Sequence, residues 1–252
     1  MTPLRRAGLV AVVALALPAP AAAGPSKPLV AEGLSLYAGY CSTCHGSAGR
    51  GITAPGGLPG AGGKQGLGPP LRGVGALAAD FYLRTGYMPL GHPGEQPRRT
   101  GVSFDDRQIR ALVAYVASLG KGPAIPTPHP ERGNLAEGLH LFTEHCAGCH
   151  QIVARGGVVT GARVPPLDKA TPTQIAEAVR IGPYLMPRFA PRQLSNSELD
   201  SIIRYVQYAK DPDDRGGWAL GHLGPVPEGL VAWLLAGAVL VAVAVVIGRR
   251  AG

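Results

Sequence analysis

The chain has 252 residues, enough for one large domain or two of ordinary size. Charged residues make up 16% and aromatic residues 6%, while 37 Gly and 25 Pro are present, a composition that excludes a coiled coil and disfavours a large β-barrel. The formal charge is +8, but Lys and Arg are scattered without a long basic run, so we expect no nucleic-acid partner.

The first residues of the chain predict an export signal. Arg5 and Arg6 precede an apolar run over residues 7–17, and a stretch of small residues follows. This order of charged, apolar and small-residue regions is typical of secretory signals. As a helix, the apolar run would span only about 16 Å of a membrane core of about 30 Å. We therefore expect a signal peptide over residues 1–23, cleaved after Ala23.

The two halves of the mature chain share five landmarks in the same order. The landmarks are 33–37 and 138–142, 41–45 and 146–150, 69–71 and 165–167, 84–89 and 180–187, and 115–116 and 205–206. Ordered self-similarity of this kind indicates a duplicated domain. We expect one domain over residues 24–120 and a second over residues 134–210.

Each copy is expected to begin and end with a helix. The opening helices carry apolar stripes at helical spacing, Leu34, Tyr37, Ala38 and Cys41 in the first copy and Leu135, Leu139, Phe142 and Cys146 in the second. The closing helices carry Ile109, Leu112, Val113 and Val116, and Leu199, Ile202, Ile203 and Val206. The pairs Asp105 with Gln108 and Ser195 with Glu198 predict the caps of the closing helices, because each pair can satisfy free N–H groups. These stripes are expected to face the core.

Two segments are predicted to be irregular. Residues 121–133 contain four prolines, which favour an extended connector between the domains. Residues 46–68 contain ten glycines, so they are excluded from helix and from central strand. We interpret this glycine-rich segment as a surface insertion.

All four cysteines lie in two Cys-x-x-Cys-His motifs, Cys41–Cys44–His45 and Cys146–Cys149–His150. This spacing is the signature of covalent c-type haem attachment: two thiols bond the two haem vinyls, and the next residue places its imidazole on the iron. A zinc ribbon would require closer Cys pairs, and a redox pair or a simple disulfide would leave both histidines unexplained. We therefore predict two covalently bound haem c groups.

The second axial ligands are inferred from the scarcity of methionine. The chain has three methionines including the first residue, and the other two, Met88 and Met186, occupy matching places before a proline. A lone methionine usually fills a core, but two at corresponding positions favour thioether ligands to iron. His92 is the rival ligand in the first copy, although no histidine lies near Met186 in the second. His45 and His150 supply the other axial nitrogen.

Two prolines are candidates to orient the ligand histidines. The carbonyls of Pro69 and Pro165 can accept a hydrogen bond from the second ring nitrogen of His45 and His150, although both prolines could equally be simple loop residues. The other histidines, His129, His140, His145 and His222, are expected at the surface.

The C-terminal part predicts one membrane span. Residues 230–247 contain no charge, and residues 229–248 would reach about 30 Å as a helix. Arg249 and Arg250 follow, so the positive-inside rule places the tail 249–252 in the cytoplasm. We expect a cell-membrane protein with a single span at 229–248, a membrane-proximal segment at 211–228, and both haem domains on the extracytoplasmic side.

The order of helix, Cys-x-x-Cys-His, Pro-x-Leu, Met-Pro and closing helix resembles class I cytochrome c, twice, over residues 30–120 and 134–210. This resemblance implies an all-α fold of two tandem cytochrome c domains with low-spin, six-coordinate haem, followed by the transmembrane helix. More narrowly, the arrangement and the run over residues 216–229 resemble the dihaem cytochrome c subunits of actinobacterial menaquinol-oxidising cytochrome bc complexes. The glycine-rich segment departs from that family.

The resemblance implies a function and partners. In that family, electrons pass from quinol through a Rieske iron–sulfur protein to the two haems and on to a terminal haem–copper oxidase, in an assembly with cytochrome b. The chain would be an electron-transfer subunit of a quinol–cytochrome c reductase without a substrate pocket of its own. An alternative is a dihaem electron-transfer subunit of a periplasmic dehydrogenase or of another oxidase. A dihaem peroxidase is disfavoured by two intact His/Met sets, because it needs an iron with an open site.

Overall fold

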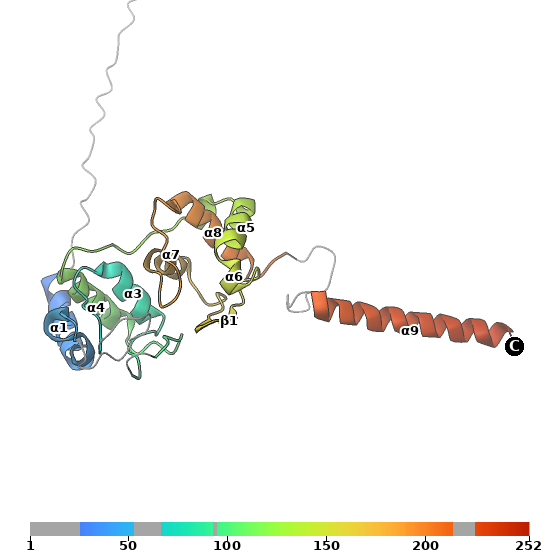
Figure 1. Cartoon of the computed structure of the whole chain (residues 1–252), viewed down its shortest axis with the longest axis horizontal. Coiled ribbons are helices and arrows are strands. Elements are labelled where there is room, and N and C mark those ends of the chain that lie inside the picture. Colours follow the sequence, from blue (N-terminus) through green and yellow to red (C-terminus); the bar gives the residue numbers. More distant parts are fainter. Residues whose placement is uncertain (1–25, 53–66, 93–94, 214–224, 252) are drawn as a thin grey trace, which may run out of the picture.

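The computed structural model describes residues 26–52, 67–92, 95–213 and 225–251. In chain order its elements are α1 Lys27–Tyr40, α2 Ser42–His45, η1 Ser47–Gly49, α3 Gly75–Arg84, α4 Asp106–Ser118, η3 Pro130–Arg132, α5 Leu135–His145, α6 Ala147–His150, β1 Gly157–Val159, β2 Ala162–Val164, α7 Pro172–Ile181, α8 Asn196–Tyr208 and α9 Pro225–Ala251. Figure 1 shows two helical bodies followed by the separate helix α9. The predicted signal peptide lies outside the described residues.

The predicted all-α fold is confirmed, and the two halves have the same internal arrangement. In the first domain α1 packs against α4 and α3 packs against α4; in the second, α5 packs against α8 and α7 against α8. The closing helix α4 supplies most of the first core and α8 supplies the largest share of the second, since their apolar stripes at i, i+3, i+4 and i+7 are buried. The main addition to the predicted fold is the short antiparallel hairpin β1–β2 in the second domain.

The predicted capping pairs begin both closing helices. Asp105 accepts from the backbone N–H of Gln108 at 2.8 Å, and the Gln108 side chain accepts from the N–H of Asp105 at 3.0 Å. Ser195 and Glu198 form the same reciprocal arrangement at the start of α8. Each capping box satisfies two of the N–H groups that the first turn of a helix leaves free.

The predicted stripes of the opening helices are wrong in part. Leu34 is 49% exposed and Leu139 is 40% exposed, whereas Tyr37 and Phe142 are buried as expected. In each helix a second buried residue lies four positions before the aromatic one, and it is a glycine: Gly33 before Tyr37 and Gly138 before Phe142. A Cβ on Gly33 would overlap the carbonyl of Ala111 in α4, so the opening helix approaches the closing helix through a residue without a side chain.

The connector between the domains is extended up to η3 and is held at both ends. The carbonyl of Pro123 accepts from the N–H of Leu77 at the start of α3, at 3.2 Å. At the other end, the N–H of His129 donates to the carboxylate of Asp200 in α8, at 2.7 Å. The prolines keep the chain extended, and these contacts attach it to both domains.

The two domains meet through α3 of the first domain and α7 of the second, which lie next to each other in Figure 1. Arg99 donates to the side-chain oxygen of Gln174 at 2.8 Å, and Gln174 donates to the backbone carbonyl of Arg84 at 3.4 Å. Gln96 exchanges two hydrogen bonds with the backbone of Arg163 in β2, at 2.7 and 3.0 Å. Two glutamine amides and one arginine side chain therefore supply these hydrogen bonds across the junction.

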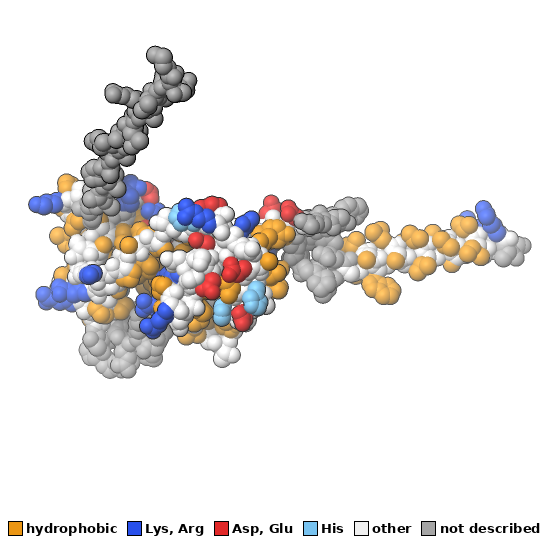
Figure 2. Space-filling model, turned by 90° about the horizontal axis from the view of Figure 1, so that it is seen from above, with side chains coloured by type: hydrophobic (Ala, Val, Ile, Leu, Met, Phe, Trp, Pro, Cys, Tyr) orange, Lys and Arg blue, Asp and Glu red, His pale blue; other side chains and the backbone are white. Residues whose placement is uncertain are grey.

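Helix α9 has the length and apolarity that a membrane span needs. Residues 229–250 have a mean hydropathy of 2.9 in their most apolar window, and none of that window is buried against the rest of the chain. Figure 2 shows hydrophobic side chains along the helix and basic side chains at its far end. The predicted C-terminal span is thus confirmed as one apolar helix able to cross a membrane.

Candidate haem-binding sites

Each Cys-x-x-Cys-His motif forms one short turn of helix directly after an opening helix. In the first copy, the N–H of Cys41 bonds the carbonyl of Tyr37 at 2.9 Å, and the N–H of His45 bonds the carbonyl of Cys41 at 2.9 Å. In the second copy, Cys146 bonds Phe142 at 2.8 Å and His150 bonds Cys146 at 2.9 Å. A single helical turn places residues three and four apart on one face. The two thiols and the imidazole of each motif are therefore presented together.

The four cysteines are free thiols in the structure. The first cysteine of each motif is half-buried and the second is exposed. Burial, followed by the charge of the neighbouring cysteine, raises the pKa of Cys41 and of Cys146 to about 11. Within the described residues, no group of three or more His, Cys, Asp or Glu side chains is placed to hold a metal ion on its own.

Both motif histidines are oriented by a proline carbonyl. Nδ1 of His45 lies 2.8 Å from the carbonyl oxygen of Pro69, and Nδ1 of His150 lies 3.2 Å from that of Pro165. A carbonyl only accepts, so this contact assigns the proton to Nδ1 and leaves Nε2 with a free lone pair. Burial lowers the pKa of His150, and the Pro165 carbonyl acts in the opposite direction. A neutral imidazole with Nε2 free is the form that binds iron.

The ends of the glycine-rich segment are part of the first site, which corrects the interpretation of the whole segment as a surface insertion. Gly46, Gly49 and Gly68 are buried. A Cβ on Gly68 would overlap the carbonyl of Cys44, so this glycine lets the chain return beside the motif. The N–H of Gly51 donates to the carbonyl of His45 at 2.7 Å. Residues 53–66, which contain the rest of the segment, lie outside the described residues.

The two methionines occupy corresponding loops after α3 and α7. The backbone N–H of Met88 bonds the carbonyl of Tyr82 at 3.1 Å, and that of Met186 bonds Pro183 at 3.0 Å. Both side chains are half-buried, and Met186 packs against the core of the second domain. His92, the rival ligand, is exposed.

A tyrosine hydroxyl holds the chain after each motif, a feature that the sequence analysis missed. Tyr37 of α1 donates to the carbonyl of Gly46 at 2.7 Å, while in the second domain Tyr205 of α8 donates to Ile152 at 2.6 Å. The rings pack at a tilt in the helix crossing, Tyr37 against Tyr115 at 5.0 Å between centroids and Phe142 against Tyr205 at 5.3 Å. The hydroxyl thus comes from the opening helix in one copy and from the closing helix in the other.

The remaining described histidines take part in contacts outside these sites. The His129 ring lies 3.1 Å from a carboxylate oxygen of Glu131, and His140 and His145 both lie near Glu144. Their side chains are 74% exposed in His140, 43% in His129 and 39% in His145. His222 lies outside the described residues.

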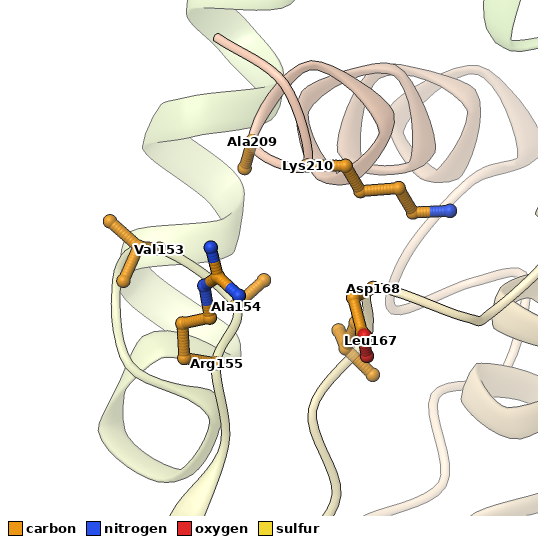
Figure 3. Close-up of a pocket in the computed structure, with 7 residues that line it drawn as sticks. All are labelled: Val153, Ala154, Arg155, Leu167, Asp168, Ala209 and Lys210. Carbon is orange, nitrogen blue, oxygen red and sulfur yellow. The ribbon is translucent and has the colours of Figure 1, made fainter. Parts of the chain in front are cut away.

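One cavity lies in the second domain between the end of α8 and the loops around it, with Arg155 and Lys210 on opposite walls (Figure 3). Its volume is about 20 Å³, enough for about one water molecule. Nζ of Lys210 donates to the carbonyl of Ala170 at 2.7 Å and to Gln207 at 2.9 Å. This cavity is too small for an organic substrate.

The residues fit covalent haem. Each domain offers two thiols on one turn, an imidazole with Nε2 available and a methionine from a half-buried loop, and these are the groups that c-type haem requires. Residues 30–120 match the family model of cytochrome c, and residues 133–206 match that of the cbb3-type cytochrome c oxidase subunit III. The fold and the sites therefore define a c-type cytochrome with two cytochrome c domains.

Curated relatives identify the family more closely. The cytochrome bc1 complex cytochrome c subunit of Corynebacterium diphtheriae is 37% identical over 242 residues, which cover 89% of this chain and 82% of the relative. That of Mycobacterium tuberculosis is 35% identical over 253 residues, covering 96% and 86%. The chain belongs to the family of cytochrome bc1 complex cytochrome c subunits, and the predicted resemblance is confirmed.

A more distant relative is a subunit of a cytochrome c oxidase. The cbb3-type cytochrome c oxidase subunit CcoP of Azospirillum sp. is 29% identical over 199 residues, covering 70% of this chain and 61% of the relative.

Membership of the family of cytochrome bc1 complex cytochrome c subunits gives the chain an electron-transfer role in a cytochrome bc complex, as a component of a quinol–cytochrome c reductase.

Proposed function

We propose that the chain carries electrons from a Rieske iron–sulfur protein, through two covalently bound haems in series, to a terminal haem–copper oxidase. The observation that carries the proposal is the matched pair of sites in one chain, each with a Cys-x-x-Cys-His turn and an imidazole bonded to a proline carbonyl. When bound, each haem supplies a one-electron ferrous–ferric couple. The chain's own contribution is to attach, orient and enclose these groups.

The proposed ligand set follows from the same residues. Cys41 and Cys44 in the first domain, and Cys146 and Cys149 in the second, form the thioether bonds. His45 and His150 provide the imidazole ligands, and the matching loops favour Met88 and Met186 as the opposite ligands. A thioether ligand favours ferrous iron and so raises the potential relative to a second imidazole. With an imidazole and a thioether both supplied by the chain, each site would be suited to electron transfer and unsuited to binding a substrate at iron.

The proposed orientation places both domains, within residues 24–210, on the extracytoplasmic side of the cell membrane. Its support is the apolar helix α9 with Arg249 and Arg250 at the end. Signal peptide 1–23 would direct the export that c-type haem attachment requires. Membrane attachment keeps the two sites beside cytochrome b and the Rieske protein, so that no diffusing carrier is needed.

An oxidase subunit is the second candidate. The match of the second domain to the cbb3-type oxidase subunit III model and the likeness to CcoP of Azospirillum favour it. The domains and the sites would be the same, and only the partners would differ.

Gentle detergent extraction from native membranes, followed by affinity isolation of the tagged chain, separates these functions. Mass spectrometry should find a cytochrome b and a Rieske protein with the chain, together with a haem–copper oxidase. Isolation with an oxidase core or a dehydrogenase, and with neither cytochrome b nor a Rieske protein, would contradict the proposal. A variant lacking residues 225–252 is the control for attachment through α9.

A further inference from the structure

A buried carboxylate lies in the contact between the two domains. Glu177 of α7 has no exposed surface, and α7 packs against α3 of the first domain. In the repeat, Arg180 corresponds to Arg84, so Glu177 corresponds to Phe81, three residues before that arginine. Phe81 is buried and apolar. The second domain therefore carries an ionisable group where the first has a hydrocarbon ring.

Among the described residues, Glu177 has no fixed partner of opposite charge, and no donor group bonds either of its carboxylate oxygens. A hydrogen bond between Glu177 and the neighbouring Asp80 requires a proton on one of the two carboxyl groups. The facing helix α3 presents Asp80, which is 5% exposed, and Arg84, whose Nε bonds Asp80 at 2.8 Å. Arg84 also bonds Asp106 of α4 at 2.8 Å, so its charge is already shared between two carboxylates.

The other cations near this junction are also engaged. Arg99, from the segment before α4, donates to Gln174, one turn before Glu177. Lys210, at the end of α8, donates to Ala170 and Gln207. Arg180 of α7 is directed to the carbonyls of Phe189 and Leu194. An ionised Glu177 would thus be buried beside another carboxylate, with no cation of its own among the described residues, which is an unfavourable arrangement for a charge.

Protonation removes this cost. Burial, and next the negative charge of Asp80, raise the pKa of Glu177 to about 8, while Arg84 opposes the rise. At neutral pH the side chain is therefore a neutral carboxylic acid, which can donate a hydrogen bond. Asp80 of the facing helix, whose Oδ1 accepts from Nε of Arg84 at 2.8 Å, is the acceptor that the surroundings offer.

We propose that a proton held by Glu177 and directed at Asp80 fixes the arrangement of the two haem-binding domains, and that the junction loosens when this proton is lost. Glu177 is thus a positioning residue: it sets how one site is placed relative to the other and touches neither. The uncharged links through Gln96 and Gln174 do not titrate, so the carboxyl pair is the part of the junction that responds to pH. This inference rests on the domain contact and not on the identity of the electron partners.

The direction of the pH effect follows from linkage. In an opened junction Glu177 meets water and regains its ordinary pKa of 4.5, whereas in the closed junction its pKa is about 8. The closed state therefore binds the proton more tightly. The equilibrium constant for closing the junction is largest below pH 4.5. It falls by up to about tenfold per pH unit between pH 4.5 and pH 8, and it changes no further above pH 8.

The test is hydrogen–deuterium exchange of the haem-loaded full-length chain in detergent, followed by mass spectrometry of peptides from α3 and α7. Measurements from pH 5 to pH 9 are corrected for the intrinsic exchange rate. In the unaltered protein, protection of both helices should fall as pH rises to about 8. Glu177→Gln keeps a neutral donor of the same shape, so its protection should stay constant over this range. Glu144→Gln, an exposed change on α5, should behave as the unaltered protein does.

A second variant tests the proposal if Glu177→Gln does not fold. Asp80→Asn removes the neighbouring charge and so lowers the pKa of Glu177, which should shift the end of the transition to lower pH and reduce its amplitude. A pH profile that is flat in the unaltered protein would overturn the proposal. A profile that persists unchanged in Glu177→Gln or in Asp80→Asn would do the same.

Discussion

Nη2 of Arg180 lies 2.8 Å from the side-chain oxygen of Asn196, the first residue of α8. The other terminal nitrogen of Arg180 donates to the carbonyls of Phe189 and Leu194, at 3.1 and 2.7 Å. One side chain thereby holds both the loop that carries Met186 and the start of the closing helix. In the first domain, Arg84 makes the equivalent contact with Asp106, the first residue of α4.

We predict that Arg180→Met loosens the loop around Met186. Three hydrogen bonds from a charged donor are lost and two partly buried carbonyls are left unpaired. This should lower the free energy of unfolding by about 2 kcal/mol. The methionine–iron charge-transfer band of one haem should disappear at a lower denaturant concentration than in the unaltered protein. Arg188→Met, an exposed change in the same loop, is the control and should leave that midpoint unchanged.

The helix crossing of the first domain depends on the missing side chain of Gly33. In Gly33→Ala the new methyl group would overlap the carbonyl of Ala111, so α1 and α4 must move apart. The overpacking should cost about 1–3 kcal/mol, visible as a lower unfolding temperature. Gly39→Ala in the same helix meets no atom within 4 Å and should be neutral or stabilising, because alanine favours a helix. Equal effects of the two changes would contradict this account of the crossing.

The tyrosine hydroxyls hold the loop after each motif. Tyr37→Phe removes the hydrogen bond to Gly46 and leaves that carbonyl buried, which should lower the free energy of unfolding by about 1 kcal/mol. Tyr205→Phe should act similarly through Ile152. Chemical denaturation of the haem-loaded protein measures both effects. Tyr40→Phe, at a residue that is 65% exposed, is the matched control and should change the free energy little.

The proposed thioether ligands can be tested one domain at a time. Met186→Ala should abolish the methionine–iron charge-transfer absorption of one haem and lower the potential of that haem, because a ligand that favours ferrous iron is removed. Met88→Ala should do the same for the other haem, and the double variant should lose the band entirely. An unchanged spectrum in either single variant would remove that methionine from the ligand set.

The parts of the fold that follow local rules were predictable from the sequence. Capping pairs such as Asp105 with Gln108 and the stripes of α4 and α8 are set by nearest neighbours and periodicity, and the structure confirms them. The span in α9 follows from composition alone. The contacts of His45 with Pro69 and of His150 with Pro165 could be named from the repeat.

The remaining features depend on contacts distant in the sequence. Gly33 and Gly138 look like weak points in a helix until a second helix is placed against them, so periodicity favoured Leu34 and Leu139 instead. From the sequence, Glu177 is indistinguishable from an ordinary polar position of an amphipathic helix, because the contact of α7 with α3 of the other domain is distant in the sequence. The sequence feature that could have indicated the burial of Glu177 is its correspondence in the repeat with Phe81, an apolar residue.

The central claim is that one chain holds two haems through thioether bonds. The most direct test is extraction of the purified full-length protein with acidic acetone, followed by intact mass measurement of the polypeptide. The account predicts that the colour stays with the protein and that the mass exceeds that of the polypeptide by two haem groups. Haem released into the acetone, or a polypeptide without added mass, would contradict it.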